Sequence, residues 1–420
     1  MKDSGLPWIG NMPEDWHIAS NKFILKKEKN IIDRYNGETI LSLTMKGVIK
    51  RNLDAGGKMP SSFVGYQRVK KDRLLLCLFD IDVTPRCVGI INEDGITSPA
   101  YSQYIVEQSN CLKYYYYYFL MLDNDKTLVH LTKSLRNTIN ANEFGNLKTI
   151  VPPKEEQQQI ADYLDKKCSK IDKLSQQITD EIEDLKAYEN SLITKAVTKG
   201  LNTNVPMKAS GIEWIGKIPE NWKFEKLKYL SSCNDETLDD STRKDYEFDY
   251  VDISSVTFGK GISKYEKMTF ETSPSRARRI VKAGDVIIST VRTYLKAIAY
   301  IQKHDLPIVV STGFAVLRPN SKVNKRFFMY ATQANTFISR IEADSYGVSY
   351  PAINADKLVN CGILVPPKKE QAEVAKYLDE KCAEINKLIL QKTRQSKLIR
   401  EYKSSLIYDY VTGKKQVPTN

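Results

Sequence analysis

The chain has 420 residues, which is too long for one ordinary domain, so two to four compact units are expected. Its net charge of +12 favours an anionic partner, nucleic acid or a membrane surface, although solubility alone would also explain it. Seven scattered cysteines without a Cys-x-x-Cys pair argue against a disulfide framework or a zinc knuckle. The most apolar run, residues 114–122, is shorter than the roughly 20 residues of a membrane helix. We therefore expect a soluble, cytoplasmic protein that binds no membrane.

Residues 1–150 form a first block of mixed α and β character. Short apolar runs at 74–79 and 88–91 are bounded by glycine, proline and polar residues, as is typical of strands. A helix is expected near residues 112–122, and its tyrosine run at 114–118 is interpreted as buried or half-buried.

Residues 151–205 are predicted to form a long helix followed by a linker at 199–206. Pro152 and Pro153 precede the helix, where proline is tolerated. Apolar residues then recur every seven positions, which is the pattern of a coiled coil. Leu174, Ile182 and Tyr188 are expected to fill the same seam. The recurring residues are Leu164, Ile171, Ile178, Leu185 and Leu192.

Residues 206–364 form a second mixed block, and residues 365–420 a second long helix. Strands are expected at 249–253, 286–288, 297–301 and 314–317, and helical stretches at 325–341. In the second long helix only Lys392 interrupts the apolar row, and we expect Leu388, Leu398 and Tyr402 to lie beside that row. The row consists of Leu378, Ile385, Ile399 and Leu406.

The two halves of the chain are repeats of one another. Residues 4–16 reappear as 210–222, the Ile-Asn-Ala at 139–141 as 353–355, and the segment from Val151 to Thr198 as Val365 to Thr412. We predict α/β (α+β) domains alternating with long coiled-coil helices of about 60 Å. The helices would pair antiparallel in a pseudo-two-fold circular arrangement. The alternative is two ordinary core helices.

Sequence patterns of catalysis are missing. There is no Gly-rich phosphate-binding motif, and His17, His130 and His304 stand alone without metal-ligand or triad spacing. We predict no catalytic residues, no metal and no cofactor bound by this chain. An active site assembled from residues far apart in sequence stays open as an alternative.

Positive charge is concentrated in the divergent blocks. Residues 1–150 carry net +4 and residues 206–364 net +5, whereas residues 151–205 carry net −2. Within the blocks, basic residues cluster with hydrogen-bonding and aromatic ones, the types that contact phosphates and bases; a solvated set of strand ends is the alternative. The candidate DNA contacts are Arg68, Lys70, Arg73, Arg86, Ser98, Tyr101, Arg136, Arg276, Arg278, Arg279, Arg292, Tyr294, Lys296, Ser311, Thr312, Tyr346, Ser349, Tyr350 and Asn354.

The chain resembles the specificity subunits of type I restriction–modification systems. The resemblance rests on residues 210–222, on Val310 to Pro319, and on the Pro-Pro-Lys-Lys-Glu-Gln segment at 366–371 with its twin at 152–157. The alternation of divergent and helical blocks is that family's layout. The first block departs from it at Ser98-Pro-Ala-Tyr101, where the second has Ser311-Thr-Gly-Phe314.

The resemblance implies two target-recognition domains, at 1–150 and 206–364, each reading one half of a split site in double-stranded DNA. The helical blocks at 151–205 and 365–420 would set the spacing and bind two modification subunits. Those subunits would bring S-adenosylmethionine, and restriction subunits would bring ATP and Mg. The alternative is a coiled-coil scaffold that binds other proteins through its two divergent domains.

Overall fold

The computed structural model describes residues 1–52, 60, 62–132, 135–202, 204–212 and 215–418. The chain divides into two compact units, each containing one divergent block and part of both long helices. Unit 1 comprises residues 1–179 and 394–420, and unit 2 comprises residues 180–393.

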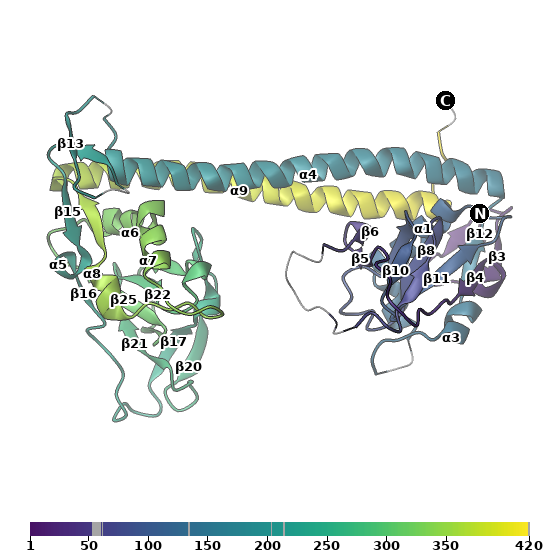
Figure 1. The fold of residues 1–420 in the computed structure, drawn as a ribbon, viewed down its shortest axis with the longest axis horizontal. Coiled ribbons are helices and arrows are strands. Elements are labelled where there is room, and N and C mark those ends of the chain that lie inside the picture. Colours follow the sequence, from purple (N-terminus) through teal and green to yellow (C-terminus); the bar gives the residue numbers. More distant parts are fainter. Residues whose placement is uncertain (53–59, 61, 133–134, 203, 213–214, 419–420) are drawn as a thin grey trace. The chain divides into compact units, whose positions relative to one another are not determined.

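Unit 1 begins with a series of short strands and ends its block with three helices and a strand (Figure 1). The elements are β1 (Lys2–Asp3), β2 (Asn11–Met12), β3 (His17–Ser20), η1 (Asn21–Phe23), β4 (Leu25–Glu28), β5 (Leu41–Thr44), β6 (Gly47–Lys50), β7 (Gln67–Val69), β8 (Arg73–Cys77), β9 (Val88–Ile91), β10 (Gly95–Thr97), β11 (Tyr101–Val106), α1 (Leu112–Asn124), α2 (Thr127–His130), α3 (Ala141–Asn146) and β12 (Lys148–Val151).

Unit 2 repeats this order with additional strands. The elements are β13 (Met207–Ala209), β14 (Lys217–Pro219), β15 (Lys223–Lys226), α5 (Leu227–Leu230), β16 (Ser231–Cys233), β17 (Glu247–Val251), η2 (Ile253–Ser255), β18 (Val256–Thr257), β19 (Gly261–Ile262), β20 (Glu266–Thr269), β21 (Ala277–Val281), β22 (Val286–Ser289), η3 (Thr293–Leu295), β23 (Ile298–Tyr300), β24 (Ile308–Ser311), β25 (Phe314–Pro319), α6 (Lys325–Gln333), α7 (Asn335–Ala343), α8 (Ala355–Asn360) and β26 (Gly362–Val365).

Both units contain the same antiparallel four-stranded sheet, here called the shared sheet. Its strand order is β4-β11-β8-β9 in unit 1 and β16-β25-β22-β23 in unit 2. The central strands β8 and β22 are buried on both faces, which explains why their sequences are continuous apolar runs rather than alternating ones. The strands and helices expected from the sequence are confirmed, except that the helical stretch at 325–341 is divided at Ala334.

Unit 2 has a second sheet beyond the shared one. Its order is β20-β17-β24-β21, and β17 pairs parallel with β24. Among the described residues of unit 1, the corresponding part of the chain forms the two-stranded pairs β5–β6 and β7–β10 and two isolated bridges, Ile31–Gln67 and Ile40–Ile96. The units therefore differ in whole elements and not only in side chains.

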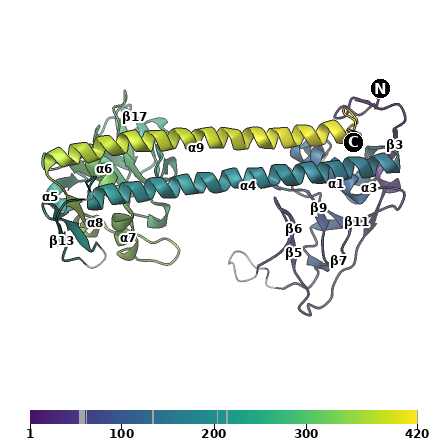
Figure 2. The same ribbon diagram turned by 90° about the horizontal axis from the view of Figure 1, so that it is seen from above.

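The two long helices are α4 (Lys154–Lys199) and α9 (Lys368–Val411), and they lie side by side in both views (Figures 1 and 2). Within unit 1, Tyr163 stacks on Tyr410 and Asp172 binds Lys403. Within unit 2, Glu181 pairs with Lys392, and Asn386 donates to Glu189 at 3.0 Å. Rising residue numbers in α4 meet falling numbers in α9, so the pairing is antiparallel.

The seam between the helices differs from the expected one in its second row. Leu164, Ile178, Leu378, Ile385 and Leu406 are buried, and Ile171, Leu185, Leu192 and Ile399 are half-buried. Ile182 lies in the seam as expected, but the placement of five further residues there was wrong. Four of them lie three residues after a first-row residue, whereas the second row lies four residues after it, and the fifth, Leu398, directly precedes Ile399. Cys168, Ile182, Cys382 and Ile389 occupy that row, whereas the exposed residues are Leu174, Tyr188, Leu388, Leu398 and Tyr402.

The Pro-Pro-Lys-x-Glu-Gln segment fastens each long helix to its block. Gln157 Oε1 accepts from the backbone N–H of Cys111 at 2.8 Å, just before α1, and its Nε2 donates to Pro152 O at 2.8 Å. In the same way, Gln371 Oε1 accepts from the backbone N–H of Asn324 at 2.6 Å, just before α6, and Gln371 Nε2 donates to Pro366 O at 2.8 Å. Because both amide ends are used inside the fold, this repeated glutamine has a structural role.

A second repeated anchor lies two turns further along each helix. Tyr117 donates from its hydroxyl to Asp165 at 2.8 Å, and Lys113 pairs with the same carboxylate. In unit 2, Tyr330 donates to Asp379 at 2.8 Å, with Arg326 as the cation. Equivalent carboxylates, Asp165 and Asp379, therefore orient one equivalent helix in each block, α1 and α6.

The end of each long helix meets a tryptophan of the repeated motif. In unit 1, Gly413 (φ +71°) follows α9 and lies against Trp16, which is fully buried. In unit 2, Gly200 (φ +76°) follows α4 and lies against Trp222, also fully buried. Only glycine adopts this backbone conformation without strain, so it ends the helix where the indole packs. Trp214 of the same motif lies outside the described residues.

Candidate nucleic-acid interface

Five loops of unit 2 meet at one end of its sheets. They are residues 252–255, 275–276, 290–296, 311–313 and 345–352, here called the loop cluster of unit 2. Backbone hydrogen bonds join them: Thr290 N to Gly313 O at 2.8 Å, Ile353 N to Thr290 O at 2.9 Å and Thr312 N to Arg276 O at 2.8 Å. Segments spread over 100 residues of sequence are thus held in one surface.

The loop cluster of unit 2 carries exposed aromatic side chains with cations stacked on them. Tyr346 is 69% exposed and Tyr350 is 65% exposed, and Tyr294 is exposed beside them in η3. The Arg292 guanidinium lies 4.9 Å from the ring centroid of Tyr350, and Lys357 Nζ lies 3.8 Å from that of Tyr346. Exposed aromatic faces and nearby cations suit nucleic acid, whose bases stack and whose phosphates are anionic.

Backbone strain is concentrated in the same loops. Arg292 (φ 52°) and Lys296 (φ 50°), at the two ends of η3, adopt the left-handed conformation although neither is glycine. Each such residue costs on the order of 1 kcal/mol or more, and such strain is common where a side chain must be aimed. Lys296 is also ion-paired with Glu342 at 3.6 Å.

Arg276 is positioned by a carboxylate. Its Nη2 lies 3.0 Å from Asp252, and its Nε donates to the Tyr250 hydroxyl at 3.2 Å. Partial burial acts to raise the pKa of Asp252, but hydrogen bonds from Ser254 and Tyr250 together with the Arg276 charge hold that pKa below its usual value. The carboxylate therefore stays ionised and keeps the exposed guanidinium in place.

Four other sequence candidates of unit 2 are engaged within the fold. Arg278 stacks over Phe270 at 4.7 Å, Arg279 is half-buried, and Ser311 is buried in β24. Asn354 caps α8 by accepting from Lys357 N at 2.8 Å. Thr312 and Ser349 are exposed in the loop cluster.

Unit 1 brings together the corresponding loops, residues 78–86 after β8 and residues 131–139 before α3, of which 133–134 lie outside the described residues. Ile139 N donates to Leu78 O at 2.9 Å, as Ile353 N does to Thr290 O in unit 2. Arg136 is exposed here, next to the fully exposed Leu135 and near the exposed Val83. Residues 98–100 lie at the same end of the shared sheet, because Tyr101 at the start of β11 pairs with Cys77 at the end of β8. These segments are the loop cluster of unit 1.

The remaining candidates of unit 1 are ion-paired, held in a turn, or lie outside the loop cluster. Arg86 is only 14% exposed and binds the buried Asp123 at 3.1 Å. Arg68 pairs with Glu38 at 3.0 Å and Arg73 with Glu28 at 3.2 Å. Lys70 is exposed, and Ser98 and Tyr101 form a turn through Tyr101 N and Ser98 O.

Sequence reasoning missed Val83, Leu135, Val348 and Lys357, which lie in or beside the loop clusters. Val348 is fully exposed in the 345–352 loop, and Lys357 covers Tyr346. One signal could have found Leu135, Val348 and Lys357: in each half these segments immediately precede or follow the repeated Ile-Asn-Ala, while their own sequences differ.

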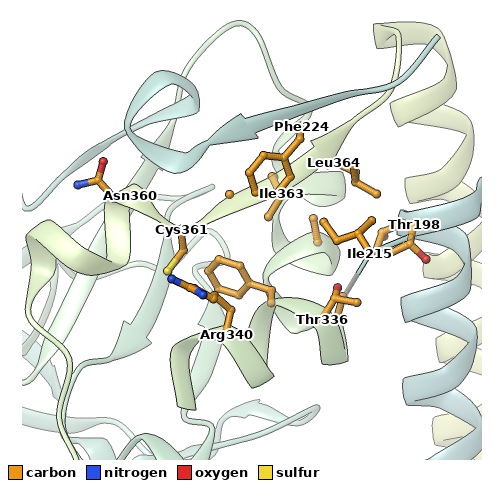
Figure 3. Close-up of a pocket in the computed structure, with 14 residues that line it drawn as sticks. Thr198, Ile215, Phe224, Thr336, Arg340, Asn360, Cys361, Ile363 and Leu364 are labelled. Carbon is orange, nitrogen blue, oxygen red and sulfur yellow. The ribbon is translucent and has the colours of Figure 1, made fainter. Parts of the chain in front are cut away.

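A cavity of about 130 Å³ in unit 2 lies between the end of α4, the β15–β26 pair and helices α6 and α7 (Figure 3). Its lining is largely apolar, and the Arg340 guanidinium lies beside Cys361 (Figure 3). It lies where the long helix meets the block, and none of its lining residues belongs to the loop cluster of unit 2.

The seven cysteines are free, and burial raises the pKa of most of them, to about 11 for Cys168 and Cys361 and about 12 for Cys382. Such thiols are protonated at neutral pH and are poor nucleophiles. Within the described ranges, no three His, Cys, Asp or Glu side chains gather as they would around a metal ion. No helix in that part of the chain is both long and apolar enough to span a membrane.

Comparison with known proteins gives one consistent result. A family model described as the type I restriction modification DNA specificity domain matches residues 88–184 and 219–395. The MjaVIII specificity subunit of Methanocaldococcus jannaschii is 27% identical over 290 residues, which covers 65% of this chain and 63% of that protein. The putative MjaX specificity subunit of the same organism is 25% identical over 440 aligned positions, covering 98% and 96%.

The fold has a counterpart among solved structures. A chain from a structure titled as the basis of complex assembly and conformational transition of the type I R-M system superposes with a TM-score of 0.69 at 12% identity. The match covers 96% of this chain and all of that one.

Two blocks with one shared sheet and different loops, each fastened to a repeated helix, define a class of protein that presents two distinct binding surfaces on one scaffold. The chain belongs to the family of type I restriction–modification DNA specificity subunits. That family recognises DNA and is not itself catalytic, and a scaffold that binds only proteins is not favoured.

Proposed function

We propose that the domains at 1–150 and 206–364 each read one half of a bipartite site in double-stranded DNA. The observation that carries this proposal is the contrast between the repeated shared sheets and the divergent loop clusters. Two different half-sites require two different reading surfaces, whereas the elements that hold those surfaces can stay alike.

Within each loop cluster, lysine and arginine fix position on phosphates, and polar and aromatic side chains select bases. In unit 2 these are Arg276, Arg292, Tyr294, Tyr346 and Tyr350. In unit 1, Arg136 takes the corresponding place. Phosphate contacts make the affinity fall steeply as the salt concentration rises.

The helical blocks at 151–205 and 365–420 act as a spacer and as a docking surface for two modification subunits. The support is their repetition: Leu174 and Leu388, and Tyr188 and Tyr402, occupy equivalent positions and are all exposed. S-adenosylmethionine, ATP and Mg belong to the modification and restriction subunits, and the complex works in the cytoplasm.

The experiment that tests this function is an exchange of residues 1–150 for the same block of a specificity subunit that reads another site. Sequencing of methylated DNA from cells with the modification subunit should show one half of the site changed. The other half and the gap between halves should stay as they were, because unit 2 and most of both helices are untouched. A change in both halves, or in neither, would contradict the two-reader model.

A further inference from the structure

A groove of about 370 Å³ opens in unit 2 where β26 passes into α9. It is lined by the Pro366-Pro367-Lys368 segment, the outer side of β15 and the turn before α6, with Tyr229 among the lining residues. Tyr229 is 53% exposed, and Lys228 Nζ lies 5.3 Å from its ring centroid. We call this surface the end groove.

The elements of the end groove occur again in unit 1. Phe23 stands at the position of Tyr229, is 69% exposed, and has Lys22 Nζ at 5.5 Å from its ring centroid. The neighbouring backbone is tied in the same way, by Glu107 N to Ile24 O at 2.9 Å and by Asn320 N to Leu230 O at 2.8 Å.

The proline–lysine side of the groove is repeated as well. Lys154, the counterpart of Lys368, donates to Gln108 O at 2.6 Å in the turn before α1. Pro153 and Pro367 are both exposed at the start of the long helices. An aromatic ring, a lysine stacked on it and a Pro-Lys step are therefore displayed twice.

The end groove lies at the opposite end of the shared sheet from the loop cluster. Strand β25 begins at Phe314, directly after the 311–313 loop, and ends at Pro319, next to the groove turn. Strand β11 likewise begins at the 98–100 loop and ends before Glu107. Six residues of strand span about 20 Å. A duplex held at a loop cluster therefore leaves the end groove to another partner, which makes a protein the fitting occupant.

The charge of the groove indicates what kind of protein segment it takes. In unit 2 the lining residues include Lys223, Lys322 and Lys368 against one carboxylate, Glu225, and Lys228 lies beside the ring of the lining residue Tyr229. In unit 1 the corresponding positions hold His17, Lys22, Ser109 and Lys154, and Ala19 replaces the carboxylate. A basic rim with an exposed ring at one end complements an acidic segment that carries an apolar anchor.

We propose that the end groove of unit 2 and the equivalent surface of unit 1 each dock an acidic segment with an apolar anchor from one modification subunit. This rests on the proposed function, because a repeated surface requires a repeated partner. Phe23 and Tyr229 are the central contacts, and the stacked lysines supply the charge.

The test uses the full chain with the modification subunit of the same system, in four forms: wild type, Phe23→Ala, Tyr229→Ala and the double variant. Copies bound are counted by native mass spectrometry, and affinities are measured by titration. Loss of a central aromatic contact at an interface weakens binding about 30-fold or more. Each single variant should keep one tight copy, and the double variant should lose both.

Tyr346→Ala is the matched control, because that ring is as exposed but lies in the loop cluster. It should change DNA binding and leave the modification subunit bound as in wild type. Lys22→Glu with Lys228→Glu should weaken docking without removing a ring. The melting temperature of each variant should stay at the wild-type value, since the substituted side chains are exposed.

If the double variant bound two copies with wild-type affinity, the docking proposal would be overturned. The proposed function would still stand if the wild-type complex methylates a bipartite site. A wild-type complex that methylates no such site would overturn the proposed function, and the groove proposal with it.

Discussion

Units 1 and 2 share a sheet, a helix-anchoring glutamine and a buried tryptophan, yet they differ most where their loops gather. Unit 2 adds a second sheet with a parallel pair, and its loop cluster displays three exposed tyrosines. Unit 1 has two-stranded pairs in that region, and its loop cluster displays Val83, Leu135 and Arg136. Contacts between the blocks and the helices constrain residue identity strongly, whereas loop tips that leave the packing intact are free to diverge.

Even repeated contacts differ in chemistry between the units. At one equivalent place in the seam, Lys403 binds Asp172 in unit 1, whereas Glu189 accepts from Asn386 in unit 2. Trp16 donates from Nε1 to Glu156 at 2.9 Å, but Trp222 Nε1 is buried with no hydrogen-bond partner among the described residues. Shape has been kept at these positions while polarity has changed.

The two tryptophans give the largest expected effect. Trp16→Ala and Trp222→Ala should each lower the free energy of unfolding by about 3–5 kcal/mol, because each deletes a fully buried ring. Trp16→Phe should cost about 1.5–3 kcal/mol more than Trp222→Phe, since only Trp16 donates to a carboxylate. Urea unfolding measures both differences. Equal costs for the two Phe variants would mean that the Glu156 contact contributes nothing.

The seam comes next. Ile178→Ala in unit 1 and Ile385→Ala in unit 2 should each cost about 2–5 kcal/mol, because both side chains are buried between the helices. The matched exposed positions, Leu174→Ala and Leu388→Ala, should stay within about 0.5 kcal/mol of wild type. Thermal unfolding of the four variants separates the two rows. A large cost at Leu174 would restore the three-residue register for the seam.

The loop clusters should differ in what they contribute to recognition. Arg292→Ala should weaken binding to the DNA site by about 1–3 kcal/mol. The variant should also discriminate less against base changes in the half-site that unit 2 reads, and discriminate as wild type does against changes in the other half-site. Arg243→Ala removes the same charge from an exposed surface pair with Asp245 and serves as the control. Titration against duplexes altered in one half at a time makes the measurement. Equal losses for both halves would contradict separate readers.

The smallest effect concerns Glu189. Burial raises its pKa, and hydrogen bonds from Cys382 and Asn386 offset this only in part. The folded state therefore binds the Glu189 proton more tightly than the unfolded chain does. The resulting stability is fully present below the ordinary glutamate pKa and is lost as the pH rises through the raised folded value.

Glu189→Gln should remove this dependence and make unit 2 slightly more stable than wild type at neutral pH, with the difference vanishing in acid. Unfolding midpoints measured from pH 4 to pH 7 test it, and Glu183→Gln, at an exposed position, is the control. An advantage that grows toward low pH would have the wrong sign.

Much of the fold could be predicted because its signals are local. The strands β8, β22 and β25 are continuous apolar runs, and the first row of the seam is a plain seven-residue repeat. Of the second row, Ile182 could be predicted, but the rest could not, because Leu174 is more apolar than Ser175 and Leu388 is as apolar as its neighbour Ile389. Burial at these positions is decided by helix geometry rather than by hydrophobicity. Leu174 was therefore assigned to the seam when it lies on its edge.

The candidate site was less predictable, because side-chain partners are set by tertiary structure. Nothing in the sequence near Arg86 indicates that it reaches Asp123, and nothing near Asn354 separates a helix cap from a base contact. The convergence of the five loops of unit 2 depends on the strand order. Clusters of basic and aromatic residues nevertheless indicated Arg292, Tyr346 and Tyr350, which the structure brings together.

The glutamine, aspartate and tryptophan that fasten each block have a consequence for inheritance. If a gene segment that encodes the second block were moved to the first position, the block would contact Gln157 in place of Gln371 and Asp165 in place of Asp379. These residues have the same geometry. The product of such a gene rearrangement would still fold, so selection would act on the DNA site that it recognises. The repeated anchors thus make new combinations of half-sites accessible in single genetic steps.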